Sequence, residues 1–122
     1  MKSVFSFVSL FFVCLSLSAD VDELSKKEIN HLLSYVQNSK CTYIRNGTSY
    51  NSKKARNHIE RKYKYFEDEI QSTEDFIRLS ATKSMMFSSR YFIKCPHKKK
   101  IESSKWLLKE LHQYRNMVKS YN

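Results

Sequence analysis

The chain has 122 residues, of which 41% are hydrophobic and 28% are charged, and its formal net charge is +10. This length leaves room for one domain with one modest core. A single Gly and a single Pro indicate a mainly helical fold and exclude a glycine-rich phosphate loop. The sequence also lacks a Gly-x-Ser-x-Gly motif and a Cys-x-x-Cys motif, so neither a hydrolase elbow nor a redox pair is present.

The start of the chain has the layout of a secretory signal peptide. Lys2 gives a basic beginning, residues 4–17 form an apolar run, and Ser18 and Ala19 are small enough for a peptidase. The run is shorter than the roughly 20 residues of a membrane span. We expect cleavage after Ala19 or Ser18, in preference to a retained anchor or to acylation of Cys14. The predicted domains are a signal peptide over residues 1–19 and a single small helical domain over residues 20–122.

The first elements after this segment are a helix and a short strand. Apolar residues that include Leu24 recur at helical spacing and predict a helix over residues 21–38, with Asp20 and Asp22 at its start. Residues 41–45 alternate and are rich in β-formers, so we expect a strand that a turn at Asn46-Gly47 closes. Asn46-Gly47-Thr48 is also a glycosylation sequon, which would matter only in a eukaryotic secretory pathway.

Two further helices are predicted in the middle of the chain. The second begins at Asn51 or Ser52, and its apolar stripe comprises Ala55, Ile59, Tyr63, Phe66 and Ile70. Ser72 caps the third, over residues 73–83, and Asp75 can complete a capping box with it. This helix is expected to bury Phe76, Ile77, Ser80 and Ala81.

The last elements are a second strand and a fourth helix. The strand covers residues 91–94 and is stopped by Pro96. Ser103 or Ser104 caps a helix over residues 105–118, with a buried stripe at Leu107, Leu111, Tyr114 and Val118. The predicted fold is therefore mainly α (α+β), with four helices and a short two-stranded antiparallel ribbon.

Cysteine usage fits an exported protein. Cys14 leaves with the signal peptide, so the domain keeps Cys41 and Cys95. In an oxidising compartment these two permit one intramolecular disulfide, which would place the two strands side by side. The alternative is two independent buried thiols.

The positive charge is concentrated towards the C-terminus. Residues 76–122 hold eleven basic residues against Glu102 and Glu110, whereas residues 20–75 sum to zero. Such asymmetry favours contact with an anionic envelope polymer or an acidic protein. The alternative is a solvated face that keeps the protein soluble, and we expect no nucleic-acid partner for an exported chain. The candidate anion-binding residues are Arg90, Lys94, Lys98, Lys99, Lys100 and Lys105.

A second hypothesis concerns a polar site around His58 and Lys62, which are four residues apart on one helix face. Arg45, Glu74 and Ser84 could converge with them to form a ligand-binding or hydrolytic site. Alternatively, Glu74 pairs with His58 or Arg45 and only holds the elements together. No metal-ligand cluster is visible, and we expect no cofactor. A structural envelope protein or a secreted effector is the third function considered.

Several short segments together resemble a known family. They are the sequence YIRNG at residues 43–47, Ala55 with His58 and Lys62, IQSTEDFI at 70–77, ATKS at 81–84 and YFIKCP at 91–96. This ordered set resembles the YfeK-like family, small proteins of Gram-negative bacteria with signal peptides and unknown function. The resemblance covers residues 41–115 and implies a periplasmic protein with the same cysteine pair. It implies no activity.

Overall fold

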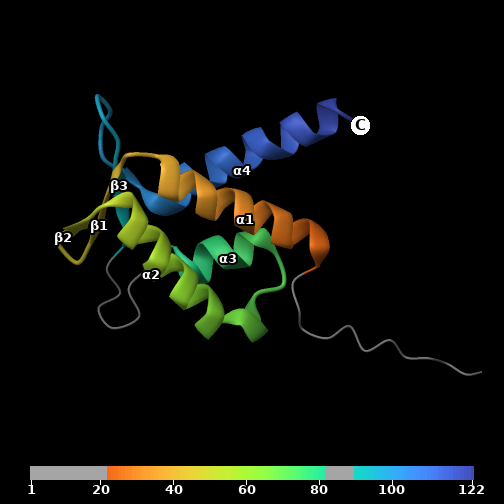
Figure 1. Cartoon of the computed structure of the whole chain (residues 1–122), viewed down its shortest axis with the longest axis horizontal. Helices are drawn as coiled ribbons and strands as arrows, with labels where there is room; N and C mark the ends of the chain where they lie inside the picture. The colour runs from red at the N-terminus through yellow and green to blue at the C-terminus, as the bar shows by residue number, and fades with distance from the viewer. Residues whose placement is uncertain (1–21, 82–89) are drawn as a thin grey trace, which may run out of the picture.

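A computed structural model describes residues 22–81 and 90–122, and the predicted signal peptide over residues 1–19 lies outside them (Figure 1). The described residues form helices and a small antiparallel sheet, which confirms the mainly helical α+β class. The helices are α1 (Glu23–Asn38), α2 (Ser52–Tyr65), the 3-10 turn η1 (Glu67–Glu69), α3 (Thr73–Ser80) and α4 (Ser103–Ser120). The strands are β1 (Thr42–Arg45), β2 (Thr48–Tyr50), β3 (Phe92–Lys94) and β4 (Ile101–Glu102).

Helix α1 is central to the packing of the helices. It contacts α2, α3 and α4, and Figure 1 shows α4 on one side of it and α2 and α3 on the other. Tyr35 of α1 stacks on Trp106 near the start of α4. Glu28, seven residues before Tyr35, accepts a hydrogen bond from Arg115 near the end of α4. These pairings run in opposite directions along the two helices, so α1 and α4 are antiparallel.

The sheet has the order β2-β1-β3-β4 and is antiparallel throughout. The expected pair is present, since Thr42 of β1 lies opposite Lys94 of β3. The predicted two-stranded ribbon is nevertheless wrong in extent, because β2 and β4 each add an edge strand. These strands have only three and two residues, too few for an alternating pattern to stand out from a turn. The disulfide Cys41–Cys95 joins the ends of the central pair across a sequence separation of 54.

The core lies where the helices meet the inner face of the sheet. It includes all four residues that the third helix was expected to bury. Leu24 is not part of it, because its side chain is 63% exposed and Ser25 and Glu28 face inwards at that end of α1. Helix α2 ends at Tyr65, so Phe66 and Ile70 reach the core from beyond the helix rather than from its stripe.

Capping residues fix most of the helix ends. The side chains of Asp22, Asn51 and Ser72 accept hydrogen bonds from amides of the first turns, as expected of N-caps. The capping box of α3 is only half formed, because the Asp75 carboxylate accepts the amide of Gln71 and not that of Ser72. Helix α3 ends at Ser80 with Ala81 as its C-cap, so the predicted helix over residues 73–83 is too long at Ala81. Residues 82–83 lie outside the described residues.

The predicted cap of α4 is wrong. This helix begins at Ser103, two residues earlier than expected, and its N-cap is Glu102, which makes no side-chain capping bond. Ser103 is fully buried, and its hydroxyl lies 3.1 Å from the phenol oxygen of Tyr43. The hydroxyl of this serine therefore links the helix to the sheet instead of capping the helix.

This buried contact gives a first prediction. The Tyr43 hydroxyl donates to the carbonyl of Ala81 at 3.3 Å and also contacts Ser103. Burial raises the pKa of this phenol, so the hydroxyl stays protonated. We expect Tyr43→Phe to lower the free energy of unfolding by about 1–2 kcal/mol, because buried polar partners are left unsatisfied.

Urea denaturation would measure this loss. Tyr121→Phe is the matched control, since Tyr121 is 85% exposed, and it should leave the unfolding midpoint unchanged. Adding Ser103→Ala to Tyr43→Phe should recover part of the loss. Equal midpoints for Tyr43→Phe and the wild-type protein would show that the hydroxyl contributes nothing.

Candidate functional site

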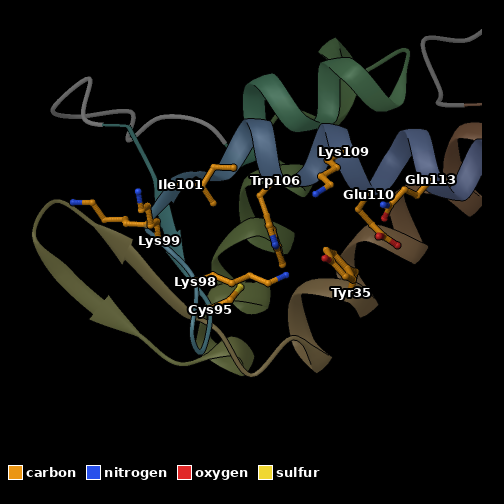
Figure 2. Close-up of a pocket in the computed structure, with 10 residues that line it drawn as sticks. Tyr35, Cys95, Lys98, Lys99, Ile101, Trp106, Lys109, Glu110 and Gln113 are labelled. Carbon is orange, nitrogen blue, oxygen red and sulfur yellow. The ribbon is translucent and has the colours of Figure 1, made fainter.

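A groove lies beside α4, where the turn between β3 and β4 approaches α1 and α4 (Figure 2). Its volume is about 470 Å³. The turn supplies its residues because Pro96 stops β3 and His97 takes a positive φ of 60°, which turns the chain back towards β4. Helix α4 supplies Trp106, Lys109, Glu110 and Gln113 at helical spacing, and α1 supplies Tyr35.

The lining of this groove is strongly basic. Four lysines contribute to it, namely Lys98, Lys99, Lys100 and Lys109. Among the described residues that line the groove, Glu110 is the single carboxylate, and its oxygen lies 2.6 Å from Nε2 of His31. The groove therefore offers an excess of positive charge to a ligand. The Glu110 carboxylate already contacts the His31 ring through one oxygen. We refer to these four lysines with Tyr35 and Trp106 as the lysine groove.

An aromatic pair forms one wall of the lysine groove. The rings of Tyr35 and Trp106 stack with centroids 4.4 Å apart and an interplanar angle of 25°. Burial, helped by the negative charge of Glu110, raises the pKa of Tyr35, so this phenol is neutral at physiological pH. Figure 2 shows Lys98 extending past Trp106 towards Tyr35. A ligand in the groove would meet both a flat apolar surface and ammonium groups.

The structure divides the predicted anion-binding residues into two groups. Lys98, Lys99 and Lys100 line the groove. Arg90 instead pairs with Glu102 at 2.8 Å, and Lys94 donates to the carbonyl oxygen of Cys95. Lys105 is exposed on α4 and is not among the lining residues.

Sequence reasoning missed Lys109 and the aromatic wall. A signal was available, because residues 106, 109, 110 and 113 share one face of the predicted last helix. Only the antiparallel contact with α1, which brings Tyr35 onto Trp106, shows that this face lines a groove.

A second polar cluster joins the hairpin of β1 and β2 to α2. Tyr43 lies opposite Tyr50 in the sheet register, and Arg45 follows Tyr43 by two residues, so all three share one face. Helix α2 presents His58 and Lys62, and Tyr91 precedes β3. We name Arg45, Tyr50, His58, Lys62 and Tyr91 the Arg45 cluster.

The contacts within the Arg45 cluster are close. The Lys62 ammonium donates to the Tyr91 hydroxyl at 3.1 Å and lies 4.7 Å from the centre of that ring. The guanidinium of Arg45 stands 5.5 Å from the ring centre of Tyr50, and Tyr50 meets His58 edge to face at 4.8 Å. The structure thus brings together three of the five residues of the predicted polar site.

The cluster holds like charges in a partly desolvated place. Burial lowers the pKa of Lys62 to about 8, and the charge of Arg45 acts in the same direction. Burial also lowers the pKa of His58, with further contributions from Arg45, Arg61 and Lys54. Burial opposes the charge of Arg45 as well, but hydrogen bonds from its guanidinium to Tyr91 and Tyr50 outweigh this and raise its pKa.

Glu74 lies in a different network. Its carboxylate accepts from Arg115 at 2.7 Å, so its observed partner is neither His58 nor Arg45. Arg115 also donates to Glu28 through two nitrogens, at 2.7 and 3.0 Å. This network joins α1, α3 and α4. Ser84, the fifth residue of the predicted site, lies outside the described residues.

The described part of the chain contains no group of three or more His, Cys, Asp and Glu side chains that could hold a metal ion. Within the same residues, no helix combines the length and the apolar character that a membrane crossing needs. Residues 23–115 match the model of a family of unknown function, DUF5329. No curated protein and no solved structure matched the chain.

Proposed function

The chain belongs to the DUF5329 family of unknown function, and we propose that it is a non-enzymatic, exported protein that binds an anionic ligand in the lysine groove. Membership in an uncharacterised family agrees with the resemblance described above, whereas the YfeK-like name stays a prediction. The family assigns no activity, so the proposal depends on the residues of this chain.

The observation that carries the proposal is the composition of the lysine groove. Four lysines surround a space of about 470 Å³, and the carboxylate of Glu110 lies against His31. A concentration of positive charge beside the groove raises the local concentration of anions and speeds their association. The stacked pair of Tyr35 and Trp106 adds contact area, which long-range charge alone does not provide.

Two features support an exported location, in the periplasm or outside the cell. The Cys41–Cys95 disulfide is compatible with an oxidising compartment, and the first residues of the sequence have the pattern of a signal peptide. In such a compartment the ligand is an anionic polymer of the envelope, since these polymers repeat charged groups along a chain. An acidic protein is the alternative partner that the experiment must separate from it.

Trp106 makes the proposal testable, because it is the only tryptophan of the chain and lies in the groove wall. Titration with heparin, as a model anionic glycan, should change its fluorescence, and polyglutamate serves as the model acidic protein. The variant with Lys98→Glu, Lys99→Glu and Lys100→Glu should lose this response. Affinity should also fall as salt rises, because exposed charges are screened within about 10 Å at 0.1 M.

A matched control separates the groove from net charge. Lys27, Lys53 and Lys64 are exposed on α1 and α2, and their change to Glu alters the net charge by the same amount. This control should keep the fluorescence response. Equal losses of the fluorescence response in both variants would show that binding depends on net charge and not on the groove. A stronger response to polyglutamate than to heparin would identify an acidic protein as the partner.

A further inference from the structure

We infer that the Arg45 cluster is a second anion site, in which Arg45, Lys62, Tyr50 and Tyr91 bind the phosphate group of a small ligand. This site is separate from the lysine groove, with which it shares no residue. The inference goes beyond the proposed function, and either one can fail without the other.

The first argument is convergence from distant parts of the chain. Arg45 and Tyr50 come from the hairpin of β1 and β2, Lys62 comes from α2, and Tyr91 comes from the residue before β3. The contact between Lys62 and Tyr91 spans 29 residues in sequence. A fold that gathers several polar side chains at one place fixes their geometry before any ligand arrives, which reduces the cost of binding.

The second argument is electrostatic. Bringing cations together in a partly buried place costs free energy, and the lowered pKa values of Lys62 and His58 express that cost. Burial raises the pKa of Tyr91, so this phenol stays neutral and supplies no counter-charge. Glu60, the acidic residue of α2 nearest in sequence to these groups, pairs with Arg56 at 3.7 Å. A bound anion would turn this unfavourable arrangement into a favourable one.

The third argument is an unused donor. The Nε atom of Arg45 is buried and has no hydrogen-bond partner among the described residues. A buried N–H without a partner costs about 1–3 kcal/mol, so it is kept only where something compensates. A ligand oxygen at this nitrogen would satisfy it.

The set of donors suits a phosphate group. A guanidinium binds phosphate oxygens in pairs, an ammonium adds a point charge, and phenol hydroxyls donate further bonds. A phosphate monoester carries a charge of about −1.5 to −2 at pH 7, which two cations match. Burial and the neighbouring cations lower the pKa of His58, which disfavours a third positive charge beside the ligand.

Calorimetric titration with sodium phosphate, at constant ionic strength held by sodium chloride, tests the site on the full oxidised chain. We expect measurable binding below about 10 mM. Arg45→Gln and Lys62→Gln should each weaken it about tenfold or more, because each removes a charge-assisted hydrogen bond. Arg45→Lys should give an intermediate affinity, since it keeps the charge and loses the paired geometry.

Lys64→Gln is the matched control, because Lys64 is exposed on the same helix, and it should bind as the wild-type protein does. Thermal unfolding of each variant shows whether it is folded. If Arg45→Gln does not fold, Lys62→Gln becomes the variant that tests the site. Tighter binding of glycerol phosphate than of inorganic phosphate would identify a phosphate carried on a larger molecule, and the reverse would identify the free ion.

No heat beyond the chloride baseline, or equal affinity in folded variants and wild type, would overturn the inference. A loss caused only by changes at Lys98 to Lys100 would place the phosphate in the groove and overturn it as well.

Discussion

Replacing both cysteines, as Cys41→Ala with Cys95→Ala, is expected to lower the free energy of unfolding by about 4 kcal/mol. The disulfide closes a loop across a sequence separation of 54 residues, and the chain-entropy model gives about this value for a loop of that length. Small domains have only about 5–15 kcal/mol of stability in total. The variant should therefore unfold at a much lower urea concentration than the oxidised wild-type protein.

Reduction gives an independent control for the disulfide. A reducing agent should destabilise the wild-type protein by a similar amount and leave the double variant unchanged. The lysine groove should respond too, because Cys95 belongs to its lining and the turn that bears Lys98 begins there. A loss below about 1 kcal/mol in both experiments would mean that the packing of the sheet on the helices, and not the covalent link, holds the two central strands together.

Local sequence patterns predicted most of the helical fold. The buried stripe of α3 and the caps at Asp22, Asn51 and Ser72 depend on residues within one or two turns of each other. The edge strands were missed for the opposite reason. Ile101 pairs with Ile93 only because the intervening turn brings the chain back beside β3. A strand of two residues is too short for its sequence pattern to predict such a pairing.

The candidate sites show the same division. His58 and Lys62 could be placed together because four residues separate them on one helix. Tyr91 was not assigned to the site, since its approach to Lys62 depends on how β3 packs beside β1 and α2. The partner of Glu74 was also missed, because Arg115 lies 41 residues away on a helix that only the tertiary packing brings near.

The network around Glu28 places a carboxylate in the core. Glu28 is only 4% exposed, and it accepts hydrogen bonds from Arg115 and, at 2.7 Å, from the hydroxyl of Thr73. The hydrogen bond from Arg115 lowers the pKa of Glu28 against the effect of burial. A buried charge of this kind is tolerated only while its partner is present.

Arg115→Met is therefore expected to lower the free energy of unfolding by about 2–3 kcal/mol at pH 7, because it leaves the Glu28 carboxylate buried without its cation. Glu74→Gln should cost under about 1 kcal/mol, since Glu74 is exposed and its bond to Arg115 lies at the surface. The double variant Glu28→Met with Arg115→Met should be more stable than Arg115→Met alone, because it removes the orphaned charge.

The pH dependence gives a second measurement of the same network. The pKa of Glu28 is lower in the folded protein than its usual value of 4.5. Its contribution to stability is therefore fully present above pH 4.5 and is lost as the pH falls through the folded pKa. In Arg115→Met, burial without the cation should hold this pKa above 4.5, so acid should relieve the defect and the difference from the wild-type protein should shrink below pH 4.5. A difference that stays constant from pH 7 to pH 3 would show that Arg115 stabilises the fold through packing of its side chain and not through the charge of Glu28.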